Sequence, residues 1–274
     1  YERGIHMPPA LNEIQESSEK ARALAGKIID LGGQTEGDTE LMAQQKEVNA
    51  LCDAMHAYVE REVAAWRTKG KIVGLVGGDH STPYGCIKAI ANATKDLGIL
   101  QIDAHMDLRA SFEGFTHSHA SIMYNVMETL PIQKLVQVGI RDFCEEEKKY
   151  AEKHADRIMV FYDQVMARER FSGATWDAQC RAIADALPSN VYISCDIDGC
   201  NPSLCPGTGT PVPGGLSFAQ FTHLLRTIVE SGRTIVGFDL NEVAPQENDS
   251  EWNANVGARI LFKLCGWTLQ SNPS

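Results

Sequence analysis

Leu97–Asp107 reads Leu-Gly-Ile-Leu-Gln-Ile-Asp-Ala-His-Met-Asp, a short apolar run that ends in alternating polar residues. The apolar run predicts a buried β-strand. Because side chains alternate along an extended backbone, Asp103, His105 and Asp107 would all point the same way. Taken alone, the triplet is equally compatible with a polar strand end whose acids are solvated.

Two further motifs follow apolar, strand-like runs. Gly77–Ser81 (Gly-Gly-Asp-His-Ser) comes after residues 71–76, and Ser194–Asp198 (Ser-Cys-Asp-Ile-Asp) ends the run that starts at residue 190. Parallel strands deliver their carboxyl ends to one edge of a sheet, where open α/β folds keep their sites. Each motif is weak by itself, but together the three predict one shared metal site. The ligands expected from these two motifs are His80, Asp196 and Asp198.

The combined ligand set indicates the metal and the chemistry. Its members are His80, Asp103, His105, Asp107, Asp196 and Asp198. Four carboxylates and two imidazoles can hold two divalent cations, and a set without thiolate favours Mn²⁺, with Ni²⁺ as an alternative, over structural zinc. A two-metal site can make hydroxide at neutral pH, which points to hydrolysis. Cys195 and Cys200 flank the last motif and are expected to pack in the core.

Apolar strand-like runs alternate with amphipathic segments along the chain. We expect helices at about 11–31, 39–68, 83–95, 119–130, 142–154, 217–231 and 254–264, with more before residue 187, and strands at 71–76, 97–102, 134–139, 157–161, 190–195 and 233–239. Near-continuous apolar strands predict a central, mainly parallel sheet covered on both faces, an α/β fold of three layers (αβα). We expect a single domain over residues 1–274, with a helical part (1–70) and a metal-binding core (71–274).

Composition limits the partners. The formal net charge of −11 disfavours nucleic acid and anionic membranes and suits a cationic substrate. Eight cysteines without a C-x-x-C pair indicate reduced thiols and a cytoplasmic protein. No apolar run approaches the length of a membrane span, and no signal peptide is visible.

The three motifs, with residues 207–215 (Gly-Thr-Gly-Thr-Pro-Val-Pro-Gly-Gly) and 238–245 (Phe-Asp-Leu-Asn-Glu-Val-Ala-Pro), resemble the ureohydrolase (arginase/agmatinase) family from about residue 71 onward. The resemblance implies an arginase-like fold, a binuclear manganese-type centre, and a homotrimer or homohexamer. It implies that one ion is held by His80, Asp103, Asp107 and Asp196. The other would be held by Asp103, His105, Asp196 and Asp198, with Asp103 and Asp196 bridging.

The same resemblance assigns roles outside the ligand set. Glu242 would pair with the guanidinium of the substrate, His119 would transfer protons, and Asp239 would support the metal ligands from behind. His117, two residues before His119, could do a similar task, and only the motif match separates the two. Within the ligand set, the chemistry of the reaction rather than the resemblance suggests that Asp107 could accept the proton of the nucleophile.

The implied reaction is hydrolysis of a small guanidino compound to urea and an amine, agmatinase-like, through a metal-bridging hydroxide. Free guanidine hydrolysis, giving urea and ammonia, is the first alternative. Formimidoylglutamase follows, for which Arg109 or Arg141 would meet a carboxylate, although we expect each arginine to form an ion pair with a nearby acid. Arginase and a non-catalytic relative complete the alternatives.

Two departures from the family pattern accompany the last ligand motif, and a larger one lies at the N-terminus. Asn201 stands where an aspartate commonly precedes the proline, and Cys200 replaces a large aliphatic residue. Neither is an expected ligand. Nothing before Lys71 resembles the strand and Gly/Pro-rich loop with which relatives begin. We therefore expect either a segment before Tyr1 or a divergent N-terminal part.

Overall fold

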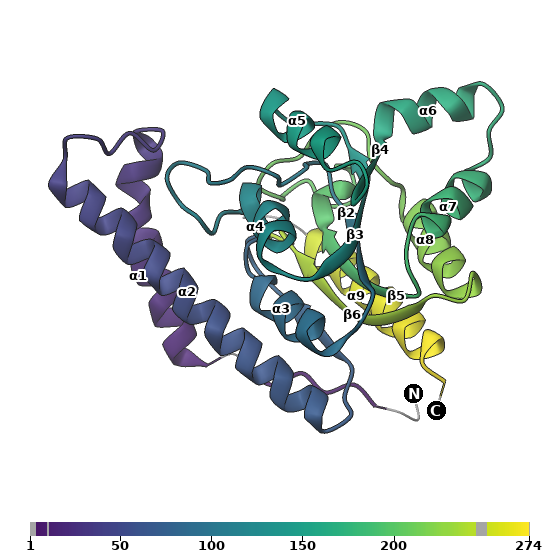
Figure 1. Ribbon diagram of the computed structural model, residues 1–274, viewed down its shortest axis with the longest axis horizontal. Helices are drawn as coiled ribbons and strands as arrows, with labels where there is room; N and C mark the ends of the chain where they lie inside the picture. The colour runs from purple at the N-terminus through teal and green to yellow at the C-terminus, as the bar shows by residue number, and fades with distance from the viewer. Residues whose placement is uncertain (1–3, 10, 245–250, 274) are drawn as a thin grey trace.

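A parallel sheet forms the centre of the molecule (Figure 1). The structure is a computed structural model that describes residues 4–9, 11–244 and 251–273. Among these residues the strands are β1 (Val73–Val76), β2 (Leu97–Ile102), β3 (Ile132–Ile140), β4 (Ile158–Tyr162), β5 (Asn190–Asp196) and β6 (Thr234–Asn241). Their order is β1-β6-β5-β2-β3-β4, and every neighbouring pair is parallel. The predicted parallel α/β fold is confirmed.

Helices connect the strands and cover both faces of the sheet (Figure 1). They are α1 (Asn12–Asp30), α2 (Thr39–Thr68), α3 (Tyr84–Ala93), α4 (Ile122–Thr129), α5 (Glu145–Lys153), α6 (Asp163–Phe171), α7 (Trp176–Asp185), α8 (Phe218–Glu230) and α9 (Trp252–Ser271). One hydrophobic core joins the sheet to α7, α8 and α9, and a second joins it to α2, α3 and α4. The three-layer prediction is therefore confirmed.

Burial follows strand position, as a parallel sheet requires. Every residue of the central strand β2 is buried, because helices lie over both of its faces. The edge strands β1 and β4 are partly exposed, with Val76 and Met159 open to solvent. The mainly apolar sequence from Leu97 to Ile102 predicted this strand because both faces of β2 lie in the core.

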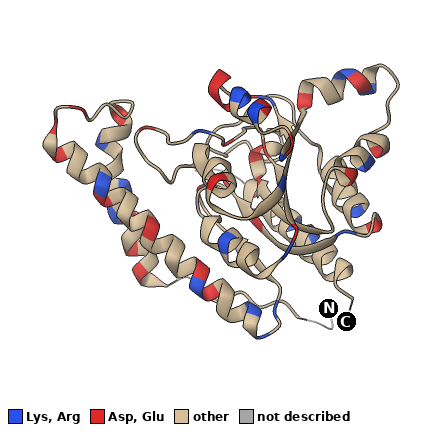
Figure 2. Cartoon of the chain, in the orientation of Figure 1, with Lys and Arg blue, Asp and Glu red and all other residues tan. Residues whose placement is uncertain are grey.

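Helices α1 and α2 form an N-terminal hairpin beside the main body (Figure 1). Gly32 and Gly33 end α1 with positive φ, as predicted from this glycine pair. Asp38 begins α2 by accepting hydrogen bonds from the amides of Glu40 and Leu41. Acidic and basic side chains are mixed along both helices (Figure 2). A small third core joins the hairpin to Phe115, far along the chain.

The last helix is longer than predicted. We expected it to end near residue 264, but α9 continues to Ser271. Thr268 is buried, and the Ser271 hydroxyl accepts a hydrogen bond from the Ile235 amide, so tertiary contacts with β6 extend the helix past Gly266. Among the described residues, no helix is both long and apolar enough to cross a membrane.

Candidate metal centre

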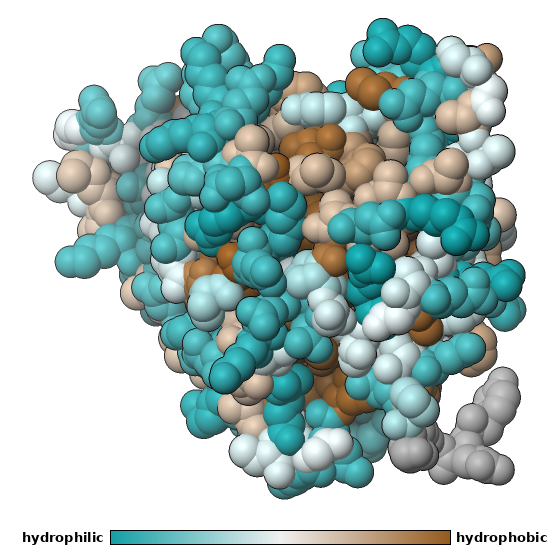
Figure 3. Space-filling view, turned by 45° about the vertical axis from the view of Figure 1, so that its right-hand side comes forward, coloured by the Kyte–Doolittle hydropathy of each residue, from teal (hydrophilic) through white to brown (hydrophobic). Residues whose placement is uncertain are grey.

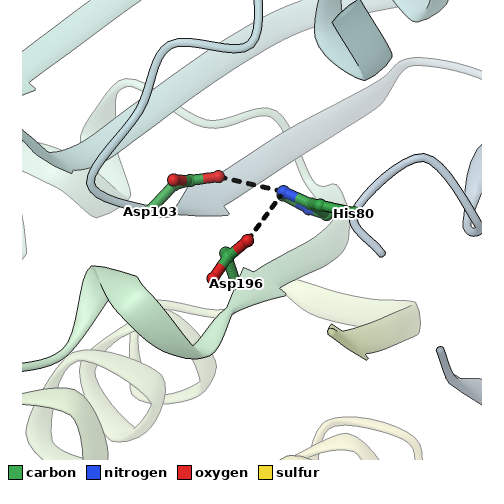
Figure 4. A group of neighbouring side chains, drawn as sticks. All are labelled: His80, Asp103 and Asp196. Carbon is green, nitrogen blue, oxygen red and sulfur yellow. Dashed lines mark ion pairs between the residues drawn. The ribbon is translucent and has the colours of Figure 1, made fainter. Parts of the chain in front are cut away.

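Three strand ends deliver the predicted ligands to one edge of the sheet. Neighbouring strands β2 and β5 pair Ile102 with Cys195, so the next residues, Asp103 and Asp196, lie side by side. His80 lies in the turn after β1. Figure 4 shows the three side chains of His80, Asp103 and Asp196 pointing toward one another. Sequence positions more than a hundred residues apart thus meet because all the strands run in the same direction.

A first group of ligands surrounds the His80 ring. Its Nδ1 lies 3.0 Å from Asp103 Oδ2, 3.0 Å from Asp107 Oδ2 and 3.4 Å from Asp196 Oδ2. His80, Asp103 and Asp196 together offer atoms close enough to share one metal ion. All four side chains are buried.

A second group lies on the other side of Asp103. His105 Nδ1 is 3.1 Å from Asp198 Oδ2 and 3.5 Å from Asp103 Oδ1, and these three residues could also hold one ion. Asp103 therefore belongs to both groups, with one oxygen toward each. Asp196 Oδ2 faces the first group, and its Oδ1 accepts a hydrogen bond from the Asp198 amide at 2.8 Å.

Buried hydrogen bonds orient the ligands. Gln101 Nε2 donates to Asp103 Oδ2 at 2.8 Å. His80 Nε2 lies 3.0 Å from the Ser194 hydroxyl, which in turn donates to Asp239 Oδ1 at 3.1 Å. Asp239 thus lies behind His80, in a supporting position, while Ser194 is a link that the sequence motif did not single out. Such outer partners fix the ring orientation of a metal ligand.

Backbone contact brings the two ligand loops together. A Cβ atom added at Gly199, one residue after Asp198, would lie 2.5 Å from the Asp103 amide nitrogen. Gly139 on β3 has φ of +96° and a similar approach, 2.9 Å, to the Asp103 carbonyl oxygen. Only glycine permits these approaches. The strand ends that carry Asp103 and Asp198 are therefore in main-chain contact.

The charges of the site fit divalent cations. Burial and the negative charges of Asp198 and Asp103 raise the pKa of Asp196 well above its usual range. Burial and the charge of Asp103 raise the pKa of Asp107 to about 7. His80 Nδ1 is buried and makes no hydrogen bond of acceptable geometry, although three carboxylates surround it. A divalent cation bound among these carboxylates and the His80 nitrogen would offset the repulsion between the negative charges.

Glu242 follows β6 and lies against the first ligand group. Its φ of +61° is unusual for a residue other than glycine, and its amide donates to the Gly78 carbonyl at 2.8 Å. Its Oε1 accepts a hydrogen bond from the His80 amide at 2.9 Å. Burial and the charge of Asp79 raise the pKa of Glu242. The motif ends at Pro245, which lies outside the described residues.

The two candidate histidines point to different partners. His119 Nδ1 lies 3.2 Å from Asp79 Oδ2, beside the ligand turn, whereas His117 Nε2 lies 2.8 Å from Asp53 Oδ1 on α2. The hydrogen bond and charge of Asp79 raise the pKa of His119. The Gly77–Ser81 motif contains Asp79, but the sequence does not indicate a role for this residue. Asp79 lies beside the predicted ligand His80, which could have drawn attention to it. Its contact with His119, however, joins residues 40 positions apart in the sequence.

The remaining predicted residues have structural roles. Cys195 and Cys200 are buried in the hydrophobic core. Asn201 donates to the Gly214 carbonyl and accepts from the Ser203 amide, so it joins the two ends of the segment 202–215, which we call the Gly/Pro-rich loop.

The two arginines differ from each other. Arg109 Nε lies 3.7 Å from Glu147 Oε2, as expected. For Arg141 the expected ion pair is wrong: among the described residues no carboxylate lies within salt-bridge distance. Its guanidinium donates instead to four carbonyl oxygens, those of Gly139, Asp198, Cys200 and Val212. This guanidinium is committed to holding the Gly/Pro-rich loop against the ligand strand.

Known proteins share this sequence pattern and this fold. The model of the arginase family matches residues 6–266. The chain is 33% identical to an N(1)-aminopropylagmatine ureohydrolase of Synechocystis sp. over 82% of this chain and 68% of that protein. It is 30% identical to an agmatinase of Halalkalibacterium halodurans over 78% of this chain and 69% of that protein.

Solved structures agree. A putative agmatinase from Clostridium difficile superposes with a TM-score of 0.65 at 26% identity, covering 85% of this chain and 75% of that one. An arginase from Bacillus subtilis, at 23% identity, shares the fold with a TM-score of 0.68, covering 81% of this chain and 79% of that one. The chain therefore belongs to the arginase family, whose members are metal-dependent hydrolases acting on C–N bonds of guanidino compounds.

Proposed function

We propose that this protein is an agmatinase-like ureohydrolase that releases urea from a linear guanidino amine at a binuclear metal centre. One observation carries the proposal. Asp103 faces two ligand groups at once, and Glu242, a carboxylate outside both, is hydrogen-bonded to the His80 of one of them. A cation-binding acid is thereby fixed beside a place for two ions.

The metals would be held by the two groups described above. Carboxylate and imidazole donors without thiolate favour Mn²⁺, with Ni²⁺ as the second candidate. A pair of divalent ions in such a site supplies a nucleophile at neutral pH by lowering the pKa of water. Asp107, whose carbonyl is fixed by the amides of Met123 and Tyr124 at the start of α4, would accept the proton of the nucleophile.

Glu242 would orient the substrate. Its Oε1 is engaged by the His80 amide, which leaves Oε2 for the guanidinium, and Oε2 faces the space beside Gly209. Charge-assisted hydrogen bonds from a planar guanidinium to this carboxylate would place the substrate carbon over the metal groups. His119, beside Asp79, would protonate the departing amine.

The arginines disfavour one alternative substrate. A formimino substrate with a carboxylate, as in formimidoylglutamase, needs a free cation near the site. Arg141 is committed to carbonyl oxygens and Arg109 to Glu147 and the ring of Phe112. Two similar proteins carry the names N(1)-aminopropylagmatine ureohydrolase and agmatinase, which supports an amine-bearing guanidino substrate instead.

A substrate panel tests the proposal. Urea release is measured with agmatine, N(1)-aminopropylagmatine, guanidine, arginine, guanidinobutyrate and guanidinopropionate, once with Mn²⁺ and once with Ni²⁺. We expect the highest kcat/KM for one of the first two compounds. A preference for free guanidine would replace the proposal with guanidine hydrolysis. No urea from any compound with two bound ions would refute ureohydrolase activity.

Asp79 gives a pH prediction. Its hydrogen bond and charge raise the pKa of His119, so Asp79→Asn lowers that pKa. If protonated His119 is the acid, kcat falls on the alkaline side, and in the variant this fall begins at a lower pH. The kcat–pH profile of the Mn²⁺-loaded enzyme measures the shift, and Asp185→Asn, at an exposed residue at the end of α7, is the control. An unmoved alkaline limb in Asp79→Asn would contradict the role of His119.

We also propose a homotrimer or homohexamer. The edge strand β4 and the adjoining helix α6 expose Met159, Val165 and Phe171, the last by 90% of its surface. The face seen in Figure 3 carries hydrophobic patches between polar side chains. Exposed apolar patches favour an interface between copies. Light scattering gives the mass in solution, and a monomer at all concentrations would contradict this.

A further inference from the structure

The loop that leads to His119 is held by helix α2. We call residues 112–118 the histidine loop, because His119 follows it directly. Three polar residues of α2, Gln45, Asn49 and Asp53, contact this loop. They are spaced four residues apart, so they form one row on the helix surface.

The middle contact is made to the loop backbone. Asn49 Oδ1 accepts a hydrogen bond from the Thr116 amide at 3.0 Å, and its Nδ2 makes a long contact, 3.5 Å, with the Gly114 carbonyl. One turn later, Asp53 Oδ1 lies 2.8 Å from His117 Nε2. The loop residues in these contacts, Thr116 and His117, lie three and two residues before His119. A shift of the backbone at Thr116 would therefore be passed to His119.

The apolar part of the loop is anchored in the same hairpin. Phe115 is buried against Ala25 and Ile28 of α1 and Val48 of α2. The fit is close, because a Cβ added at Gly33 would lie 2.5 Å from the Glu113 Cα, and one added at Gly114 would collide with the amide of Gln45. The hairpin and the histidine loop are thus closely packed against each other.

A pocket lies between helix α2 and the histidine loop. It has a volume of about 310 Å³ and is lined by Asp53, His56 and His117 among others. His56 is only 4% exposed, and neither ring nitrogen makes a hydrogen bond. The His117 ring packs against the His56 ring, with 4.5 Å between the ring centroids, so the histidine loop contacts α2 through this residue as well.

We propose that Asn49 and Asp53 are positioning residues, through which helix α2 sets where the histidine loop presents His119 to the substrate. The inference rests on the proton-transfer role proposed for His119. It adds a function for the N-terminal helices, which supply none of the metal ligands. Since proton transfer requires hydrogen-bond reach, a small displacement of His119 slows the reaction without weakening metal or substrate binding.

Paired substitutions at Asn49 test the proposal. Asn49→Ala removes the acceptor of the Thr116 amide, whereas Asn49→Asp keeps it. We expect Asn49→Ala to lower kcat roughly tenfold to a hundredfold, the cost of misplacing a group by about an ångström, with KM changed less than twofold. Asn49→Asp should stay within about threefold of the parent. The matched control is Glu47→Ala on the same helix, which removes only a surface ion pair with Lys20.

A double-mutant cycle separates positioning from general destabilisation. Each variant is first checked for two bound ions per chain and for an unchanged circular dichroism spectrum. Adding Asn49→Ala to His119→Ala should then cost nothing further, because the residue being positioned is absent. An additive loss would overturn the proposal, as would full kcat in Asn49→Ala. Should Asn49→Ala fail to fold, Asp53→Asn and Asp53→Ala replace it in the same cycle.

The cycle also distinguishes the inference from the function on which it rests. If the parent releases no urea from any substrate of the panel, the ureohydrolase proposal fails. If the parent is active but His119→Ala keeps full kcat, the role of His119 fails, and the inference with it. If His119→Ala is slow while both Asn49 and both Asp53 variants are fast, the inference alone is wrong.

Discussion

Replacing Asp196 by alanine is expected to abolish urea release and metal loading together. Asp196 Oδ2 is 3.4 Å from His80 Nδ1 and completes the first ligand group with Asp103. Its other oxygen holds the Asp198 amide, so the substitution also loosens a ligand of the second group. We expect fewer than two ions per chain by elemental analysis after loading with Mn²⁺. The loss of kcat/KM should exceed about a thousandfold, because the metal supplies the nucleophile.

Thermal unfolding gives an independent measure of the same prediction. Two ions at about a thousand times their dissociation constants each stabilise the parent by about 4 kcal/mol. Asp196→Ala should lose most of that gain in melting temperature. Without metal the difference in melting temperature should be much smaller, because removal of a buried, crowded carboxyl group offsets the loss of its hydrogen bond with the Asp198 amide.

An exposed acid provides the control for Asp196. Asp185 lies at the end of α7, and its nearest cationic partner, Arg233, is 3.9 Å away. Asp185→Ala should bind two ions and release urea like the parent. If Asp196→Ala kept two ions per chain, the ligand assignment would be wrong.

Glu242→Gln is expected to keep both metal ions and lose the substrate. Glutamine retains an oxygen that can accept the His80 amide, so the ligand turn stays in place. The negative charge that would hold a guanidinium is gone. Losing one partner of a buried charge pair costs about 3–4 kcal/mol, so kcat/KM should fall roughly a hundredfold to a thousandfold.

The comparison with Glu242→Ala separates the two roles of this side chain. Alanine removes the acceptor of the His80 amide as well as the charge, so metal affinity should fall in this variant only. Metal titration followed by steady-state kinetics on the loaded enzymes measures both effects. Unchanged kcat/KM in Glu242→Gln would contradict a role of Glu242 in substrate binding.

The strands and ligands were predictable because each signal is local in the chain. The run before Asp103 is apolar since β2 is covered on both faces. The ligands follow strand ends because parallel strands place those ends together. The prediction that the strands are parallel therefore places His80, Asp103 and Asp196 at the same edge of the sheet.

The contacts between distant segments could not be predicted. Asp79 meets His119 across 40 residues, and Asn49 meets Thr116 across 67. Both acceptors are ordinary polar residues in a turn and on a helix, where such residues are common. Arg141 shows the reverse problem, because an arginine near acids suggests an ion pair, yet its guanidinium donates to main-chain carbonyl oxygens, among them those of Asp198 and Val212.

The main-chain contact between Gly199 and Asp103 has a consequence for engineering the metal preference. The separation of the two ions would be inherited from two strands that touch, not from the length of any side chain. Exchanging one donor type for another would alter affinity and selectivity while this spacing stayed the same. Alanine at Gly199 would push the strands apart instead and alter the separation itself. Libraries that seek a nickel or cobalt enzyme should therefore vary the donors and leave this glycine untouched.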